Sequence, residues 1–131
     1  LEALVRRLGL EGCCDLSGFA SNPFAYMRRA RLFVLSSAWE GLPGVLIQAM
    51  ACGTAVLSTD CPSGPREILD GGRLGTLVQV ADPEALAQAM IEALETTPDS
   101  AALIARAQDF SLDSAVREHL RYLGLELSRA C

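Results

Sequence analysis

The 131-residue sequence contains no lysine: all 11 basic residues are arginine, against 16 acidic residues, so the net charge is −5. The absence of lysine excludes a Walker-type phosphate loop, which needs a lysine beside the phosphates. The acidic balance argues against a nucleic-acid-binding surface and a basic membrane-binding patch, because both depend on clustered positive charge. No apolar run reaches the roughly 18 residues that a membrane-spanning helix requires. Nucleic acid is therefore not an expected partner.

Metal-binding patterns are also scarce. The five cysteines have no Cys-x-x-Cys spacing, no Asp-x-Asp pair occurs, and the single histidine is His119, far along the chain. These spacings predict neither a metal site nor a disulfide framework, and they favour buried free thiols in a reducing compartment. Half of the residues are hydrophobic, which is enough to build the core of one domain.

Helical and strand patterns alternate along the chain. Apolar spacing and capping residues predict helices over 1–10, 24–29, 44–52, 66–69, 82–95, 99–107 and from 112 onward, and strands over 31–37, 55–58 and 75–80, with 13–16 as a further candidate strand. In the last helix we expect residues 115, 116, 120, 123 and 127 to face inward. Alternating strands and helices indicate an α/β fold, a Rossmann-like parallel sheet with flanking helices.

A polar group interrupts the most apolar part of the chain. Glu40 precedes the predicted helix 44–52, and Gln48 is the one polar side chain within that helix, where we expect it to face inward. The helix start also presents free backbone N–H groups. Because ligands bind outside the carboxyl ends of parallel strands, Glu40, this helix start and the loop 60–67 are expected to converge at one sheet edge.

The run from Phe33 to Leu69 resembles the donor-binding half of retaining glycosyltransferases of family 4, which have the GT-B fold. The family motif is a Glu, seven residues and a second Glu, and here the frame reads Glu40 and Gln48; the segments EGLP, AMACGTAV and SGPREIL match as well. The resemblance implies the C-terminal half of a GT-B fold without its first strand. Residues 1–131 would then form a partial nucleotide-sugar donor-binding domain, a fragment from which the N-terminal acceptor domain is absent.

The resemblance also assigns roles to residues. Glu40, as the catalytic residue, would contact hydroxyls of the donor sugar, and Gln48 would face the ribose. The other implied donor-binding residues are Gly41, Leu42, Pro43, Gly44 and Val45 at the helix start, Gly18 and Phe19 against the base, and Ser63, Gly64 and Glu67 beside the pocket. Since Gln48 replaces the second Glu of the family, we expect a donor affinity lower by about 1–2 kcal/mol.

Simpler interpretations of these residues stay open. Glu40 could be a solvated loop acid, Gln48 an amide at a partly exposed helix edge, and Arg66 and Glu67 members of a surface ion pair. Asp60 is better explained as the cap of the following turn than as a catalytic group. Trp39 could wall the donor pocket, although closing the end of the strand is the interpretation that we favour.

The expected reaction transfers a hexose or N-acetylhexosamine from a nucleotide sugar, most simply a UDP-sugar, to an acceptor hydroxyl with retention and without a cofactor. The acceptor would be a glycan or a lipid-linked sugar bound by the absent domain, so the chain alone is not expected to turn over. A non-catalytic truncated module is the alternative interpretation. A sugar-nucleotide epimerase is a third interpretation, which the lack of a histidine near the strand ends disfavours.

We expect a cytoplasmic location, with a peripheral position at the inner membrane open for the complete enzyme. An unpaired sheet edge would favour self-association.

Overall fold

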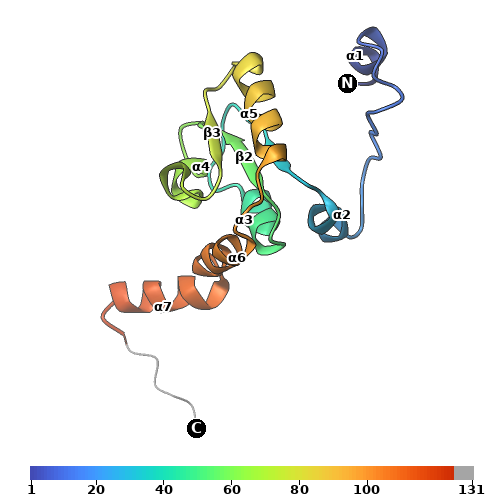
Figure 1. Cartoon of the computed structure of the whole chain (residues 1–131). Helices are drawn as coiled ribbons and strands as arrows, with labels where there is room; N and C mark the ends of the chain where they lie inside the picture. Colours follow the sequence, from blue (N-terminus) through green and yellow to red (C-terminus); the bar gives the residue numbers. More distant parts are fainter. Residues whose placement is uncertain (126–131) are drawn as a thin grey trace.

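The computed structural model describes residues 1–125 of the chain. The elements are α1 (Glu2–Arg7), α2 (Pro23–Arg29), β1 (Phe33–Leu35), α3 (Gly44–Ala51), β2 (Val56–Thr59), α4 (Pro65–Ile68), the short 3₁₀ helix η1 (Asp70–Gly72), β3 (Thr76–Val78), α5 (Pro83–Glu95), α6 (Ser100–Asp109) and α7 (Leu112–Tyr122). Their order in space is shown in Figure 1. The α/β alternation expected from the sequence is confirmed, and the predicted helices and strands differ from the observed ones mainly at their ends.

The three strands form one parallel sheet in the order β1-β2-β3. Val34 pairs with Leu57 in the first ladder, and Ser58 pairs with Leu77 in the second. The connection from β1 to β2 contains α3, and the connection from β2 to β3 contains α4 and η1. Parallel neighbours require such crossover connections, which carry the chain back to the start of the next strand.

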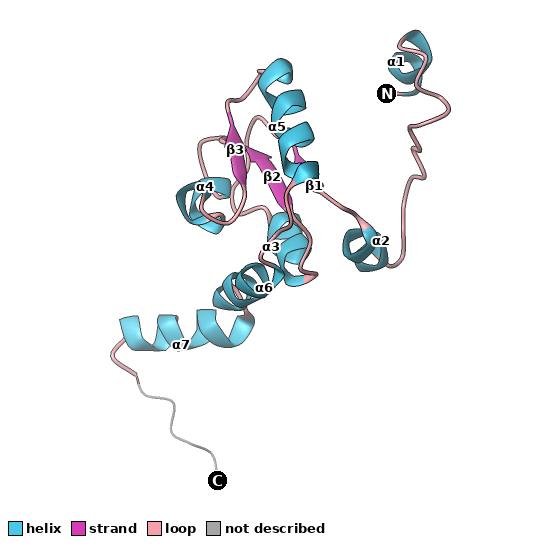
Figure 2. Ribbon diagram, in the orientation of Figure 1, coloured by secondary structure: helices cyan, strands magenta, loops and turns pink. Residues whose placement is uncertain are grey.

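Successive side chains of the central strand enter two different cores. Val56 joins a cluster with Met50 of α3 and Leu103 of α6, whereas Leu57 packs with Val78 and residues of α5. This alternation is the period-two geometry of a strand that is covered on both faces. Figure 2 shows the sheet between α5 and the α3 and α6 helices. The run 31–37 shows no polar alternation, which predicts a strand buried on both faces, and this expectation is wrong for β1, which is half-buried because it lies at a sheet edge. The strand that is buried at every position is β2.

Side-chain caps start several helices where the sequence predicts them. The Oδ1 atom of Asn22 accepts a hydrogen bond from the Ala25 amide at 3.3 Å, and Asp82 accepts one from Ala85 at 2.9 Å. Asp99 caps α6 in the same way. These contacts satisfy backbone N–H groups that have no partner inside the helix, and proline at the first position of α2 and α5 supports the same starts.

Residues 13–16 form no strand, so this candidate strand is wrong. A strand needs a neighbour for its backbone hydrogen bonds, and the sheet of the described residues offers none at this place. Instead, the amides of Cys13 and Cys14 donate to the carbonyl of Leu10 in a turn. The outer edge of β1 also has no neighbouring strand within residues 1–125.

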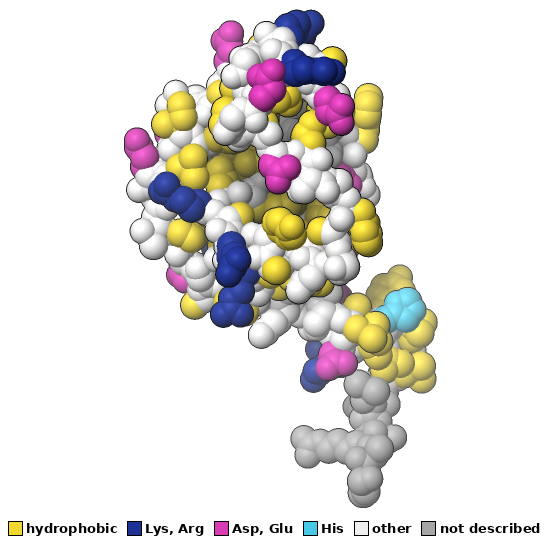
Figure 3. Space-filling model, turned by 90° about the vertical axis from the view of Figure 1, so that its right-hand side faces the viewer, with side chains coloured by type: hydrophobic (Ala, Val, Ile, Leu, Met, Phe, Trp, Pro, Cys, Tyr) yellow, Lys and Arg dark blue, Asp and Glu magenta, His cyan; other side chains and the backbone are white. Residues whose placement is uncertain are grey.

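The two terminal helices are exposed, contrary to the inward faces expected for α7. No residue of α1 or α7 is buried among those that the structure describes. Figure 1 shows α1 apart from the sheet and α7 projecting from α6. In Figure 3 hydrophobic side chains gather on α7 around the histidine, and Leu112 and Tyr122 are 79% and 89% exposed. Leu127, the last expected inward residue, lies outside the described residues.

The cysteines also differ in exposure between the core and the N-terminal segment. Cys61 is buried and Cys52 is half-buried, but Cys13 and Cys14 are exposed, so the expectation of buried thiols is wrong for the last two. Their segment packs against no core element, which leaves their side chains in solvent. Cys131 lies outside the described residues. Among residues 1–125, no helix combines the length and hydrophobicity that crossing a membrane would require.

Candidate functional site

The loops that follow β1 and β2 lie side by side at the carboxyl edge of the sheet. The Thr59 hydroxyl donates a hydrogen bond to the Ser37 carbonyl at 2.5 Å, and the Ser63 hydroxyl donates to the Glu40 carbonyl at 3.0 Å. These bonds join segments about twenty residues apart in sequence. The convergence of Glu40 with the 60–67 loop, expected from the connectivity of parallel strands, is therefore present in the structure.

The carboxylate of Glu40 has a defined position. The Ser37 hydroxyl donates to Glu40 Oε1 at 2.7 Å, and Glu40 is half-buried. A freely solvated loop acid would have no such partner, so this simpler interpretation does not describe the structure. One carboxylate oxygen is engaged by Ser37, and the group is held immediately before the start of α3.

Gly64 brings the two loops into close contact. Its φ angle is +87°, in the region that glycine tolerates and other residues rarely adopt. A Cβ atom at Gly64 would lie 2.5 Å from the carbonyl oxygen of Gly41 and 2.4 Å from Cδ of Pro43. Glycine is thus required both by the backbone conformation and by the packing of the 63–64 turn on the 41–43 segment.

The start of α3 faces solvent. Its N-cap is Pro43, whose side chain offers no acceptor for the first amides of the helix. Leu42 is 54% exposed and Val45 is 42% exposed. A helix start with free N–H groups and a positive dipole end is a suitable place for an anionic group.

Gln48 is exposed, so the inward amide expected from the sequence is wrong. The helix α3 buries Leu46, Ala49 and Met50 toward the core. Gln48 lies four residues after Gly44, and residues at this spacing share one face of a helix. The amide and the helix start therefore form one exposed surface that continues from Glu40.

Arg66 belongs to a surface ion pair with Asp60 rather than with Glu67. Its Nε atom lies 3.1 Å from Asp60 Oδ1, and a second nitrogen contacts Oδ2. The hydrogen bond from Arg66 to Asp60, and next the carboxylate charge, raise the pKa of the guanidinium. Asp60 thus joins the two ends of the loop through its ion pair with Arg66. The loop lines a surface hollow of about 590 Å³ together with Glu67, whose side chain is exposed.

Gly18 and Phe19 lie apart from this group. Gly18 lines a separate hollow formed by residues of the N-terminal segment, and Phe19 is 95% exposed. Figure 1 shows that segment leaving the body of the protein beyond α2. Their contact with a base stays a prediction. Trp39 is 81% exposed and does not close the strand end, so the interpretation that we favoured for it is wrong.

The partner of Glu40 was missed from the sequence. No role was assigned to Ser37 from the sequence, yet its hydroxyl donates to the Glu40 carboxylate and orients it. The three-residue spacing of a serine and a glutamate, which also occurs in capping boxes, could have suggested this contact.

Residues 1–96 match the family model described as "Glycosyl transferases group 1". One curated relative is the N-acetylgalactosamine-N,N'-diacetylbacillosaminyl-diphospho-undecaprenol 4-alpha-N-acetylgalactosaminyltransferase of Campylobacter jejuni, 35% identical over 127 residues. This alignment covers 94% of the chain and 35% of the relative. An uncharacterized glycosyltransferase of Methanocaldococcus jannaschii, MJ1059, is 45% identical over 69 residues, which are 53% of the chain and 17% of that protein. The chain thus spans about a third or less of these relatives.

The fold is also similar to that of a solved structure, Anabaena Alr3699/HepE in complex with UDP. The TM-score is 0.79 at 24% sequence identity, and the similarity covers 94% of this chain and 35% of the Anabaena chain. At this identity the likeness establishes the fold, which is the Rossmann-like half of a GT-B architecture.

Proposed function

Because the chain belongs to the glycosyltransferase group 1 family, we propose that residues 1–131 form the nucleotide-sugar donor-binding part of a larger retaining transferase. The observation that carries this proposal is the joined pair of loops at the carboxyl edge of the sheet. Ser63 bonds to the backbone of Glu40 while Ser37 orients its carboxylate. The acceptor would be bound by a preceding domain that this chain does not include.

Each part of the edge suits one part of a nucleotide sugar. The Glu40 carboxylate would accept hydrogen bonds from sugar hydroxyls, and the free N–H groups at the start of α3 would hold the diphosphate. Gln48, on the same exposed face, would bond to the ribose. The 63–64 turn and Glu67 would border the sugar on the side of the second loop.

The comparisons support a UDP-sugar as the donor. The solved structure of the Anabaena protein, which has the same fold, contains UDP. The name of the Campylobacter relative describes it as an N-acetylgalactosaminyltransferase. We therefore propose a hexosyl or N-acetylhexosaminyl donor and a glycan or lipid-linked acceptor. The proposal includes a cytoplasmic location, since the described cysteines are free thiols.

The transfer would break the bond between the anomeric carbon and the diphosphate and form a bond to the acceptor oxygen on the same face of the sugar, while the proton of the acceptor hydroxyl passes to the departing diphosphate. Negative charge develops on the departing diphosphate, and the positive end of α3 would stabilise it. Glu40 would hold the sugar in place during this step. Because the acceptor side of the cleft is supplied by the other domain, the chain by itself is expected to bind donor without turnover.

Calorimetry on the purified 131-residue chain tests the proposal, with UDP, UDP-glucose and UDP-N-acetylgalactosamine as probes. We expect saturable binding, with Glu40→Gln weakening a UDP-sugar more than UDP because only the sugar contacts the carboxylate. The matched control is Glu118→Gln, which alters an exposed acid on α7 and should change neither affinity. Absence of binding at millimolar concentrations would favour the alternative of a truncated module that does not bind donor.

Gln48→Glu tests the ribose contact separately. A carboxylate accepts a stronger hydrogen bond than an amide, so this change should tighten binding of UDP by about 1–2 kcal/mol. An unchanged Kd for UDP would show that residue 48 does not face the nucleotide.

A further inference from the structure

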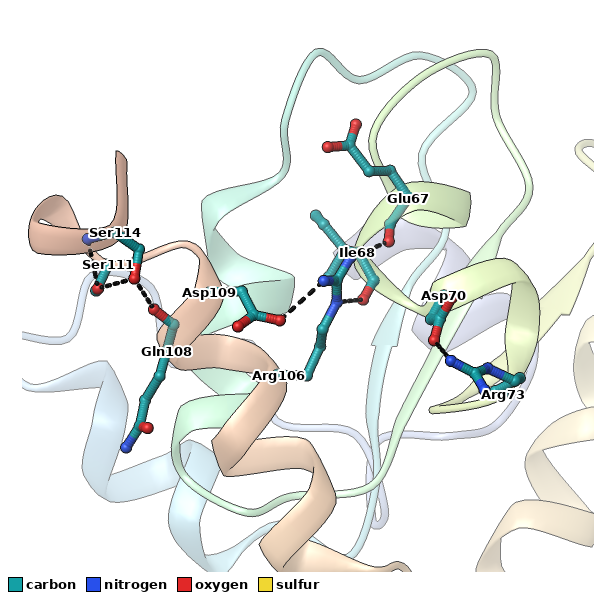
Figure 4. Close-up of polar contacts among 9 residues, drawn as sticks. All are labelled: Glu67, Ile68, Asp70, Arg73, Arg106, Gln108, Asp109, Ser111 and Ser114. Carbon is teal, nitrogen blue, oxygen red and sulfur yellow. Dashed lines mark hydrogen bonds and ion pairs between the residues drawn. The ribbon is translucent and has the colours of Figure 1, made fainter. Parts of the chain in front are cut away.

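Arg106 of α6 binds the carbonyl end of α4. Its Nε atom donates to the Ile68 carbonyl at 3.2 Å, and its Nη2 atom donates to the Glu67 carbonyl at 2.7 Å. Figure 4 shows the guanidinium joined by dashed lines to these two carbonyls on one side and to Asp109 on the other. The contacts span 38 and 39 residues of sequence, so they are tertiary interactions rather than local ones.

The helix α4 is too short to be stable by itself. It has four residues, which make one turn, and the few hydrogen bonds of so short a helix do not offset the unfavourable free energy of helix nucleation. Asp70 and Gly71, with φ angles of 52° and 67°, turn the chain out of the helix immediately afterwards. External hydrogen bonds to the last carbonyls, donated by a cation at the negative end of the helix, are the interactions that such a turn needs.

Arg106 is itself held in one orientation. It forms an ion pair with Asp109 at 2.9 Å, and its guanidinium lies 4.7 Å from the centre of the Phe110 ring. Its neighbours Leu103 and Ala107 are buried in the same core as Leu46 of α3. The helix α6 therefore supports both helices that border the candidate site, α3 by apolar packing and α4 through Arg106.

The contact fixes the backbone of Glu67 and leaves its carboxylate available. In Figure 4 the Glu67 carbonyl points toward Arg106 while the carboxylate points away from it. At the other end of the same helix, the 63–64 turn packs against Gly41 and Glu40. Displacing α4 would thus move Glu67 and the turn together relative to Glu40.

From this arrangement we infer that Arg106 is a positioning residue for donor binding, which acts by holding α4 so that Glu67 and the 63–64 turn keep their place beside Glu40. The inference rests on the proposed function of this edge. Arginine suits the role because its planar group presents two donors at a fixed spacing to two carbonyls. A lysine ammonium could not reproduce this geometry.

The test measures the Kd of the UDP-sugar that binds the wild-type chain. Arg106→Gln should weaken binding about tenfold, the size of one charge-assisted hydrogen bond, and Arg106→Lys should retain part of the affinity. The matched control is Arg117→Gln on α7, whose exposed side chain donates, within residues 1–125, to the Asp113 carbonyl of its own helix, and it should bind as wild type does. Circular dichroism before each titration establishes that each variant is folded at the assay temperature.

A double-mutant cycle separates positioning from general stabilisation. If Arg106 acts through α4, combining Arg106→Gln with Glu67→Gln should weaken binding by less than the product of the two single effects. Effects that multiply fully, or an Arg106→Gln variant that binds as wild type does, would overturn the inference while leaving the proposed function intact.

Hydrogen exchange gives a readout that does not depend on a ligand. The amides of Ile68 and Leu69 bond to the carbonyls of Gly64 and Pro65 at 2.9 Å within α4. In Arg106→Gln these amides should exchange faster than in wild type, and in Arg117→Gln they should not. Unchanged exchange would overturn the inference even if no donor bound, whereas failure of the Glu40→Gln titration alone would count only against the proposed function.

Discussion

The helices α3 and α1 are both rich in apolar residues, but only α3 is part of a core. In α3, Leu46, Ala49 and Met50 have no exposed area. In α1, Leu4 is 40% exposed and none of the six residues of the helix is buried. The difference lies in the partners: α3 contacts β1, β2, α4 and α6, whereas α1 leads away from the sheet. An apolar stripe stabilises a protein only where another element covers it.

Truncating a leucine in each helix should give the largest contrast. Leu46→Ala leaves a cavity between α3 and the sheet and should lower the free energy of unfolding by about 2–5 kcal/mol. Leu4→Ala, at an exposed site, should change it by less than about 0.5 kcal/mol. Urea unfolding followed by circular dichroism measures both values. Similar losses in the two variants would mean that α1 packs on a core in solution.

Replacing a glycine by alanine should affect stability differently in the packed 63–64 turn and in the N-terminal segment. Gly64→Ala forces a Cβ against Gly41 and Pro43 at a positive φ, which should destabilise the fold by about 1–3 kcal/mol and weaken donor binding. Gly12→Ala in the N-terminal segment has open space around it and an ordinary φ, so it should not destabilise the protein. Thermal unfolding and calorimetry check the pair, and a tolerated Gly64→Ala would show that the two loops do not pack closely.

A buried hydroxyl links α2 to the turn after α3. Thr54 is buried and donates to the Met27 carbonyl at 2.7 Å, so Thr54→Val should cost about 1–2 kcal/mol by removing a buried hydrogen bond and leaving that carbonyl with the Ala30 amide alone. Thr96→Val is the control, because its exposed hydroxyl donates to Ala93 at 3.1 Å and water can replace it. Equal stabilities of the two variants in urea would contradict the assigned contact.

Limited proteolysis should show a difference in cleavage rate between the exposed terminal helices and α6, and this is the smallest of the expected effects. Trypsin is expected to cut first after Arg6, Arg7, Arg117 and Arg121, which lie on the exposed helices α1 and α7. Cleavage after Arg106 should be slower, since its side chain is bound to Glu67, Ile68 and Asp109. Mass spectrometry of early time points identifies the cleavage sites. Early cleavage after Arg106 would argue against the hydrogen bonds by which Arg106 holds the end of α4.

Much of the fold was predictable because its signals are local. Asn22 and Asp82 cap the helices that follow them, and the runs at 33–35 and 56–59, each of which begins with apolar residues, form β1 and β2. The site was partly predictable as well, because parallel strands bring Glu40 and Ser63 to one edge whatever the side chains do. The exposed positions of Cys13, Trp39 and Leu112 were not predictable, since exposure depends on whether a partner element lies opposite.

The sequence by itself determined the α/β order, the helix caps, the parallel topology and the family to which the chain belongs. Only the tertiary structure decided that Gln48 faces outward and that Arg106 holds the end of α4. Capping and strand patterns act over a few residues and can be recognised in a sequence. Contacts across 38 residues depend on how α3, α4 and α6 pack, and that packing is a property of the whole core.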